Sequence, residues 1–161
     1  MNPLRIAPAT PADVPALLQL IRGLAGYEKL SHEVVATESM LRESLFGKSP
    51  AAEALLGFVD DRPVAFALYF TSYSTFLARA GLFLEDLFVS PEFRGRGFGE
   101  QLFRRVAQIA VERDYGRMEW AVLNWNTPAI NFYRKLGARP LDEWTGQRLA
   151  GAALLQAAKS G

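Results

Sequence analysis

The stretch from Leu84 to Gly99 reads LEDLFVSPEFRGRGFG and predicts the fold more strongly than any other part of the chain. An apolar strand pattern runs through Val89 into a turn with three alternating glycines and two arginines, and a helical pattern follows from Glu100. Glycine has no Cβ, so the backbone can approach a ligand closely. The free amides at the start of a helix favour phosphate. The stretch therefore predicts a strand, a loop and a helix that together bind a phosphate-bearing ligand.

The spacing of these glycines excludes two common nucleotide-binding loops. A dinucleotide fingerprint needs Gly-x-Gly-x-x-Gly, but Glu100 occupies the last position when it is counted from Gly95 and Gly97. A Walker loop needs a Gly-Lys-Ser/Thr ending, which this stretch lacks. The remaining structural alternative is a plain turn with solvated arginines. It is disfavoured because three glycines cost conformational entropy on folding.

Length and composition limit the class of protein. The 161 residues fit a single domain, residues 1–161, and half of them are hydrophobic. A net charge of +1 gives no argument for nucleic-acid binding, and the absence of cysteine together with a single histidine argues against a metal site. The chain has no apolar run of about 20 residues and no secretory pattern at its start. We therefore expect a cytoplasmic protein with no membrane partner.

Strand and helix patterns alternate along the chain, which predicts one mixed α/β domain. Thr10 is expected to cap the first helix with Pro11 at its first position, and Thr37 to cap the second. The expected strands cover residues 4–7, 54–59, 64–70, 82–89, 118–123 and 144–149. The expected helices cover residues 10–26, 37–46, 128–136 and 154–158, with a further helix after the glycine loop.

Four segments resemble one family in their order and spacing. They are Tyr27–Leu30, Leu84–Val89, Arg94–Gly99 and Trp125–Ala138, the last of which contains Trp-Asn-x-Pro-x-Ile-Asn-Phe-Tyr. Together they resemble the diamine (spermidine/spermine) acetyltransferase branch of the GNAT superfamily of acyl-CoA N-acyltransferases. The resemblance implies a GNAT fold: a central, mixed, mostly antiparallel twisted sheet of about six to seven strands, flanked by about four helices. In this fold, splayed central strands bind acyl-CoA.

The resemblance also implies a site for acetyl-CoA as co-substrate, without a metal. If the strand ending at Val89 splays from its neighbour, its main-chain groups can pair with the pantetheine amides as an added strand would. The amides from Gly95 to Glu100 would hold the pyrophosphate, and the two arginines would add positive charge. Asn126 is expected to be a turn or helix-cap residue, and the resemblance adds a contact to coenzyme A, a role that is compatible with the first. The full set of cofactor-binding residues is Leu87, Phe88, Val89, Arg94, Gly95, Arg96, Gly97, Phe98, Gly99, Glu100, Asn126 and Tyr133.

Acyl transfer to an alkylamine requires a proton acceptor, because the amine has a pKa of about 10.4. Glu85 is the best-placed acid, acting as a base or as an electrostatic anchor. Because side chains alternate along a strand, one of Glu85 and Asp86 should face outward, so Asp86 either belongs to the amine site or is simply solvated or paired with an arginine. Tyr133 matches the family's general acid for the leaving thiolate. A chain without cysteine favours direct attack by the amine over a thiol-bound intermediate.

The positions that match the family's amine site are acidic and aromatic. They are Tyr27, Glu28, Glu85, Asp86, Glu119, Trp120 and Ala121. A polyamine, a diamine, a lysine analogue or another primary amine remains open as the acceptor. His32 is expected to be a surface residue, because one imidazole without visible partners indicates little.

Three functions fit these observations. The first is N-acetylation of a small amine, the second is N-acetylation of a protein N-terminus or lysine, and the third is a non-catalytic acyl-CoA-binding module. The acidic amine-site positions favour the first. The resemblance also implies a homodimer, in which residues 144–158 pack across the subunit boundary or close the core of their own subunit.

Overall fold

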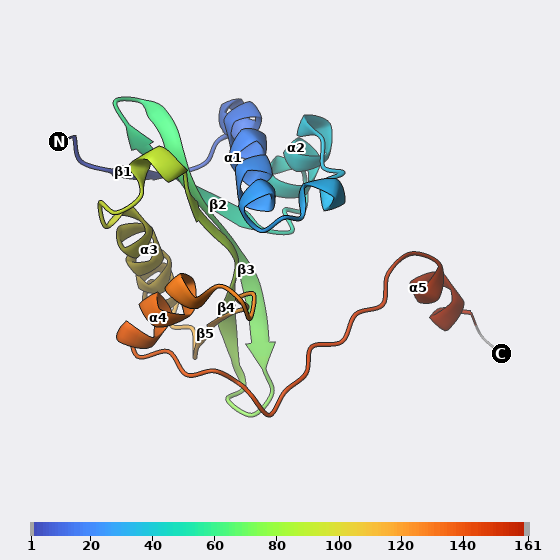
Figure 1. Cartoon of the computed structure of the whole chain (residues 1–161). Coiled ribbons are helices and arrows are strands. Elements are labelled where there is room, and N and C mark those ends of the chain that lie inside the picture. The colour runs from blue at the N-terminus through green and yellow to red at the C-terminus, as the bar shows by residue number, and fades with distance from the viewer. Residues whose placement is uncertain (1, 160–161) are drawn as a thin grey trace. The chain divides into compact units, whose positions relative to one another are not determined.

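The computed structural model describes residues 2–159, whose elements are shown in Figure 1. The strands are β1 (Arg5–Pro8), β2 (Glu53–Val59), β3 (Arg62–Ser74), β4 (Arg79–Val89) and β5 (Met118–Trp120). The helices are α1 (Val14–Tyr27), α2 (Glu38–Phe46), α3 (Phe98–Glu112), α4 (Thr127–Lys135) and α5 (Gly151–Ala157). Single 3-10 turns cover Pro11–Asp13, Ser31–Glu33 and Pro91–Phe93. The chain divides into two compact units, of which the first ends at Ala121 and the second begins at Val122.

The first unit contains a five-stranded sheet in the order β1-β2-β3-β4-β5. The first three pairings are antiparallel and β4 pairs with β5 in parallel, which confirms a mixed, mostly antiparallel sheet. The expectation of about six to seven strands is wrong, because residues 144–149 form no strand and are exposed. A strand needs a hydrogen-bonded neighbour, and a local pattern cannot supply one. For the same reason β5 ends at Trp120 and not at Leu123.

The predicted cap at Thr37 is confirmed, whereas Thr10 caps a 3-10 turn and α1 itself begins later, at Val14. Thr10 donates its N–H to the Asp13 carboxylate at 2.8 Å in the 3-10 turn that leads into α1. The Thr37 hydroxyl accepts the N–H of Met40 at 3.2 Å at the start of α2. The two-residue turn between β2 and β3 has positive φ at Asp60 (49°) and Asp61 (59°), the left-handed conformation that such tight hairpins need.

Helices cover both faces of the sheet in the first unit, with α1 and α2 on one face and α3 on the other (Figure 1). On the α1 face a buried cluster joins the helices to the strands. Its members are Val14, Leu17, Leu18, Leu20, Leu24, Leu41, Leu45, Ala54, Leu56, Phe66 and Phe88. On the α3 face the ring of Phe103 meets that of Trp120 edge-on, with centroids 5.1 Å apart. The strand predicted for the site is part of β4, which lies between these two layers of helices.

Candidate active site

A β-bulge in β4 decides where its two adjacent carboxylates lie. In the pairing with β3, Leu68 is opposite Asp86 and Tyr69 is opposite Leu84, so Glu85 is the extra residue. Leu84 pairs with Trp120 on the α3 face, whereas Phe88 belongs to the cluster on the α1 face. Alternation counted forward from Leu84 and backward from Phe88 therefore puts Glu85 and Asp86 both on the α1 face. Glu85 is exposed and Asp86 is partly buried, so one of the two carboxylates faces solvent as expected, and that one is Glu85.

Three carboxyl groups interact at this bulge. Burial, together with the negative charges of Glu85 and Glu28, raises the pKa of Asp86 to about 7. Glu28 directly follows α1, and burial raises its pKa as well. Asp86 forms no ion pair with any residue that the structure describes. The alternative that an arginine neutralises Asp86 is therefore wrong, and the cluster keeps its attraction for a cation.

The edge of β4 that faces β5 is open at the same point. β5 pairs only with Leu82 to Leu84, so from Glu85 to Val89 this edge has no strand partner within the first unit. The predicted splay between strands requires an unpaired edge of this kind. Its main-chain groups can accept an extended ligand in place of a strand.

The glycine loop after β4 is shaped to admit a ligand. Gly95 and Gly97 have φ values of 74° and 76°, and a Cβ placed on either would meet no atom within 4 Å. Gly97 is the N-cap of α3, whose first-turn amides have no partner inside the helix. Positive φ, open space and free amides together fit a phosphate group.

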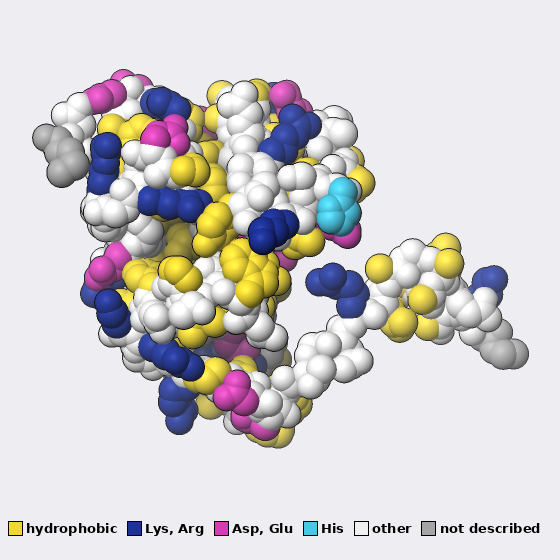
Figure 2. Space-filling view, viewed as in Figure 1, with side chains coloured by type: hydrophobic (Ala, Val, Ile, Leu, Met, Phe, Trp, Pro, Cys, Tyr) yellow, Lys and Arg dark blue, Asp and Glu magenta, His cyan; other side chains and the backbone are white. Residues whose placement is uncertain are grey.

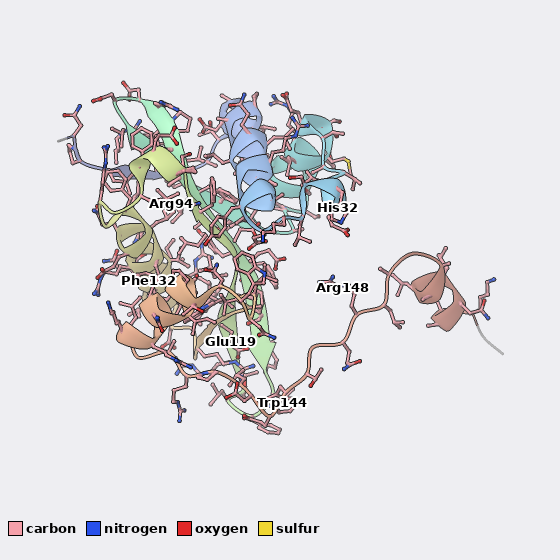
Figure 3. The ribbon with its side chains drawn as sticks, viewed as in Figure 1. His32, Arg94, Glu119, Phe132, Trp144 and Arg148 are labelled. Atoms are coloured by element: carbon pink, nitrogen blue, oxygen red, sulfur yellow. The ribbon has the colours of Figure 1, made fainter. Side chains whose placement is uncertain are left out.

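The two loop arginines have different contacts. Arg94 donates from Nε to the Val89 carbonyl at 2.9 Å, and its guanidinium lies 4.5 Å from the centre of the Tyr27 ring (Figure 3). Arg96 instead lies over Phe93, 5.2 Å from its ring centre. Phe98, the first residue of α3, is buried in the core. Arg94 thus connects the loop to the end of α1, whereas Arg96 keeps its contacts within its own segment.

The predicted residues around β5 have other partners. Glu119 forms an ion pair with Arg117, and Trp120 packs against α3. Ala121 is exposed directly after the strand. The structure therefore brings Glu28, Glu85 and Asp86 together at the bulge. The contacts described for Glu119 and Trp120 are with Arg117 and Phe103 instead.

Asn126 and Tyr133 belong to the second unit. The Asn126 side chain is buried and accepts the N–H of Ala129 at 3.4 Å, so it caps α4 as one of the two sequence interpretations proposed. Tyr133 lies on α4 with its ring 5.2 Å from that of Phe132.

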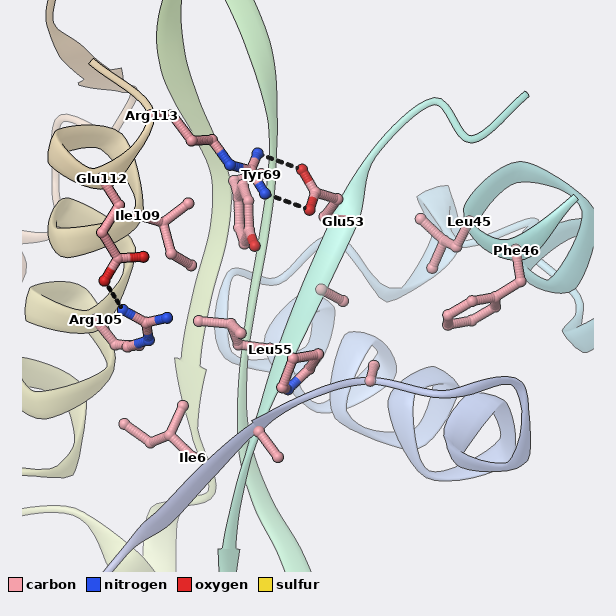
Figure 4. Close-up of a pocket in the computed structure, with 14 residues that line it drawn as sticks. Ile6, Leu45, Phe46, Glu53, Leu55, Tyr69, Arg105, Ile109, Glu112 and Arg113 are labelled. Atoms are coloured by element: carbon pink, nitrogen blue, oxygen red, sulfur yellow. Dashed lines mark hydrogen bonds and ion pairs between the residues drawn. The ribbon is translucent and has the colours of Figure 1, made fainter. Parts of the chain in front are cut away.

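A separate cavity of about 280 Å³ lies in the first unit at the end of β1 (Figure 4). Arg113 donates to both oxygens of the Glu53 carboxylate at 2.7 Å, and this hydrogen bonding lowers the pKa of Glu53. The buried Tyr69 also lines the cavity, and burial raises its pKa. No predicted site residue lines this cavity. The sequence could not reveal the Glu53–Arg113 pair, because 60 positions separate its members.

The described residues, 2–159, include no group of three potential metal ligands. No helix among them is long and apolar enough to cross a membrane. The single histidine, His32, is exposed and lies at the surface in Figure 2, 3.3 Å from the Glu33 carboxylate.

Comparison with known proteins decides the family. The model of the acetyltransferase (GNAT) family matches residues 21–138. The chain belongs to the GNAT family. It is therefore an acyltransferase, and the open strand edge and glycine loop described above are parts of a GNAT fold.

The relatives of this GNAT enzyme include proteins named for small amines. A thialysine N-epsilon-acetyltransferase of Mus musculus is 36% identical over 169 residues, which cover 98% of this chain and 99% of that protein. An L-ornithine N5-acetyltransferase of Arabidopsis thaliana is 34% identical and covers 93% of this chain and 86% of its own length. Among solved structures, an integron cassette protein of V. cholerae has a TM-score of 0.82 at 25% identity, covering 98% of both chains.

Proposed function

We propose that this GNAT enzyme transfers the acetyl group of acetyl-CoA to a primary amine of a small molecule, namely a polyamine, a diamine or a lysine analogue. The observation that carries the proposal is the cluster of Glu28, Glu85 and Asp86 beside the open edge of β4. Carboxyl groups without a cationic partner attract an ammonium group. The names of the thialysine and ornithine acetyltransferases support the same substrate class.

Acetyl-CoA would supply the activated acyl group as a thioester. The main chain from Leu87 to Val89 would pair with its pantetheine arm, and the amides from Gly95 to Glu100 would hold its pyrophosphate. Arg94 and Arg96 add positive charge to this loop. Asn126 stabilises the start of α4, which carries Tyr133. The open space at Gly95 and Gly97 supports this assignment.

The carboxyl cluster would remove the proton that blocks attack by the amine. Within the cluster, Asp86 has a pKa of about 7 and is therefore partly ionised at neutral pH, which suits a group that accepts a proton and later releases it. The neutral amine then forms the new C–N bond while the C–S bond breaks. The Tyr133 hydroxyl donates a proton to the departing sulfur, and the second proton that the nitrogen loses on becoming an amide replaces it. The chain has no cysteine that could form a thiol-bound intermediate, which favours direct attack by the amine.

The second unit suggests how two copies would associate. Trp144, Leu149, Leu154 and Leu155 are all more than half exposed. We propose a homodimer in which a second copy covers these side chains, because apolar side chains gathered at a surface favour association. Light scattering after size-exclusion chromatography should give the mass of two chains, and a monomer would contradict this part of the proposal.

Release of free coenzyme A from acetyl-CoA tests the proposed function. The acceptors are spermidine, spermine, putrescine, thialysine, lysine, ornithine, an aminoglycoside and a short peptide. We expect a clear preference for one or more small amines over the peptide. A preference for the peptide would favour protein acetylation. Background release from every acceptor, with tight acetyl-CoA binding, would contradict catalysis on these acceptors and favour a binding module.

A further inference from the structure

Arg94 occupies the point where the glycine loop, the end of β4 and the end of α1 meet. Its Nε binds the Val89 carbonyl, and its guanidinium faces the rings of Tyr27 and Phe88 at 4.5 and 5.4 Å. Phe88 is buried against α1, where a Cβ on Gly23 would come within 3.0 Å of its ring. A single side chain therefore joins the loop to the helix that ends at Tyr27.

The contacts of Arg94 are unusual for a phosphate ligand. A guanidinium presents a planar fork of donors to an anion, and stacking on an aromatic ring uses its face instead. Arg94 forms no ion pair with any carboxylate that the structure describes, although Glu28 directly follows Tyr27. Arg94 therefore leaves the carboxyl cluster available to a cation while its guanidinium lies over the Tyr27 ring.

We propose that Arg94 is a positioning residue for the amine acceptor, which it places by holding Tyr27 against the end of β4. This inference rests on the proposed function. Because Glu28 follows Tyr27 in the chain, fixing the ring also fixes the start of the acidic cluster. The glycine loop, assigned to the phosphates, and the amine site then share the contact between Arg94 and Tyr27. Through this contact, binding of either substrate changes the affinity for the other by the same factor.

The charge-preserving variant Arg94→Lys separates positioning from phosphate binding. Lysine keeps the positive charge but loses the planar face and the Nε–H that binds Val89. We expect the KM for the amine to rise roughly three-fold, the loss typical of an exposed cation–π contact. The Kd for acetyl-CoA, measured by calorimetry, should change less than about two-fold, because the charge remains. The reverse pattern, a weaker Kd for acetyl-CoA with an unchanged KM for the amine, would make Arg94 a phosphate ligand and overturn the proposal.

Arg96→Lys is the matched control, because it makes the same change in the same loop. Arg96 lies over Phe93 and not over Tyr27. We expect any effect of this variant to fall on the binding of acetyl-CoA and the KM for the amine to stay at the wild-type value. An equal rise in the KM for the amine in both variants would contradict a special role for Arg94.

A double-mutant cycle measures the contact itself without turnover. Arg94→Lys and Tyr27→Leu, alone and combined, are compared by urea unfolding. We expect the unfolding constant to reveal a coupling of roughly two- to five-fold, so that Arg94→Lys has a smaller effect once Tyr27 is leucine, when only its contacts to Val89 and Phe88 are left to lose. Strict additivity would overturn the proposal. A wild-type enzyme inactive with every amine would refute the proposed function instead, and the cycle and the calorimetry would still decide whether Arg94 couples the loop to Tyr27.

Discussion

Two carboxylates in the same sheet, Glu53 on β2 and Asp86 on β4, have surroundings that shift their pKa values in opposite directions. Glu53 receives two hydrogen bonds from Arg113, which lower its pKa. Asp86 has no described cationic partner, and burial with two neighbouring carboxyls raises its pKa to about 7. A neutralised carboxylate joins two elements, here β2 and the C-terminal end of α3, and attracts nothing further. A carboxyl left without a partner remains able to bind a cation or take a proton, which is the role that we propose for Asp86.

The largest effect should come from removing the functional acid. Asp86→Asn keeps the shape of the side chain but cannot take a proton, so we expect kcat/KM with the best amine to fall by about 10²-fold or more. The acidic limb of the pH–rate profile should also disappear. Glu53→Gln makes the equivalent change in the structural acid and should leave kcat unchanged. A larger loss in Glu85→Gln than in Asp86→Asn would assign the proton to Glu85 instead.

The raised pKa of Asp86 should also appear in the pH dependence of stability. Between about pH 4 and pH 7 the unfolded chain has lost this proton while the folded chain retains it. Unfolding then releases a proton, so the contribution of Asp86 to the free energy of unfolding falls as the pH rises across this window and levels off above it. Urea unfolding of wild type and Asp86→Asn at pH 5 and pH 8 isolates the effect. Asp86→Asn should gain stability relative to wild type at pH 8, and an identical pH dependence in both proteins would contradict the raised pKa.

Glu28→Gln tests the cause of the raised pKa of Asp86 while both Glu53 and Asp86 remain in place. The negative charge of Glu28 is one of the causes that raise the pKa of Asp86. Its removal should move the acidic limb of the pH–rate profile to lower pH, because the ionised form of Asp86 becomes less costly. The amine should also bind more weakly, since one attracting charge is lost. An acidic limb that stays in place would show that Glu28 does not act on Asp86.

The smallest effect should come from breaking the structural pair. Both partners are partly exposed, so Glu53→Gln should lower the free energy of unfolding by only about 0.5–1 kcal/mol. Raising the salt concentration should reduce the difference between variant and wild type, since exposed charges are screened. A loss of activity without a loss of stability would mean that Glu53 belongs to the functional site.

The fold and its phosphate-type loop could be predicted because their signals are local. The Thr10 and Thr37 caps, the Asp60–Asp61 turn and the helix after Gly97 each depend on a few neighbouring residues. The predicted strand at 144–149 failed because a strand also needs a partner, which no neighbouring residue in the sequence can provide.

By itself the sequence determined the strand–loop–helix unit and the residue types available for chemistry, since backbone conformation at glycines, caps and turns follows from local sterics and hydrogen bonds. Only the tertiary structure decided which acid is neutralised and which is not. The bulge at Glu85 arises from the pairing of β4 with β3, and it turns both adjacent carboxyls to one face. Arg113 reaches Glu53 across 60 positions, while no described cation reaches Asp86. Charge pairing depends on distance in space, and the order of residues along the chain does not record that distance.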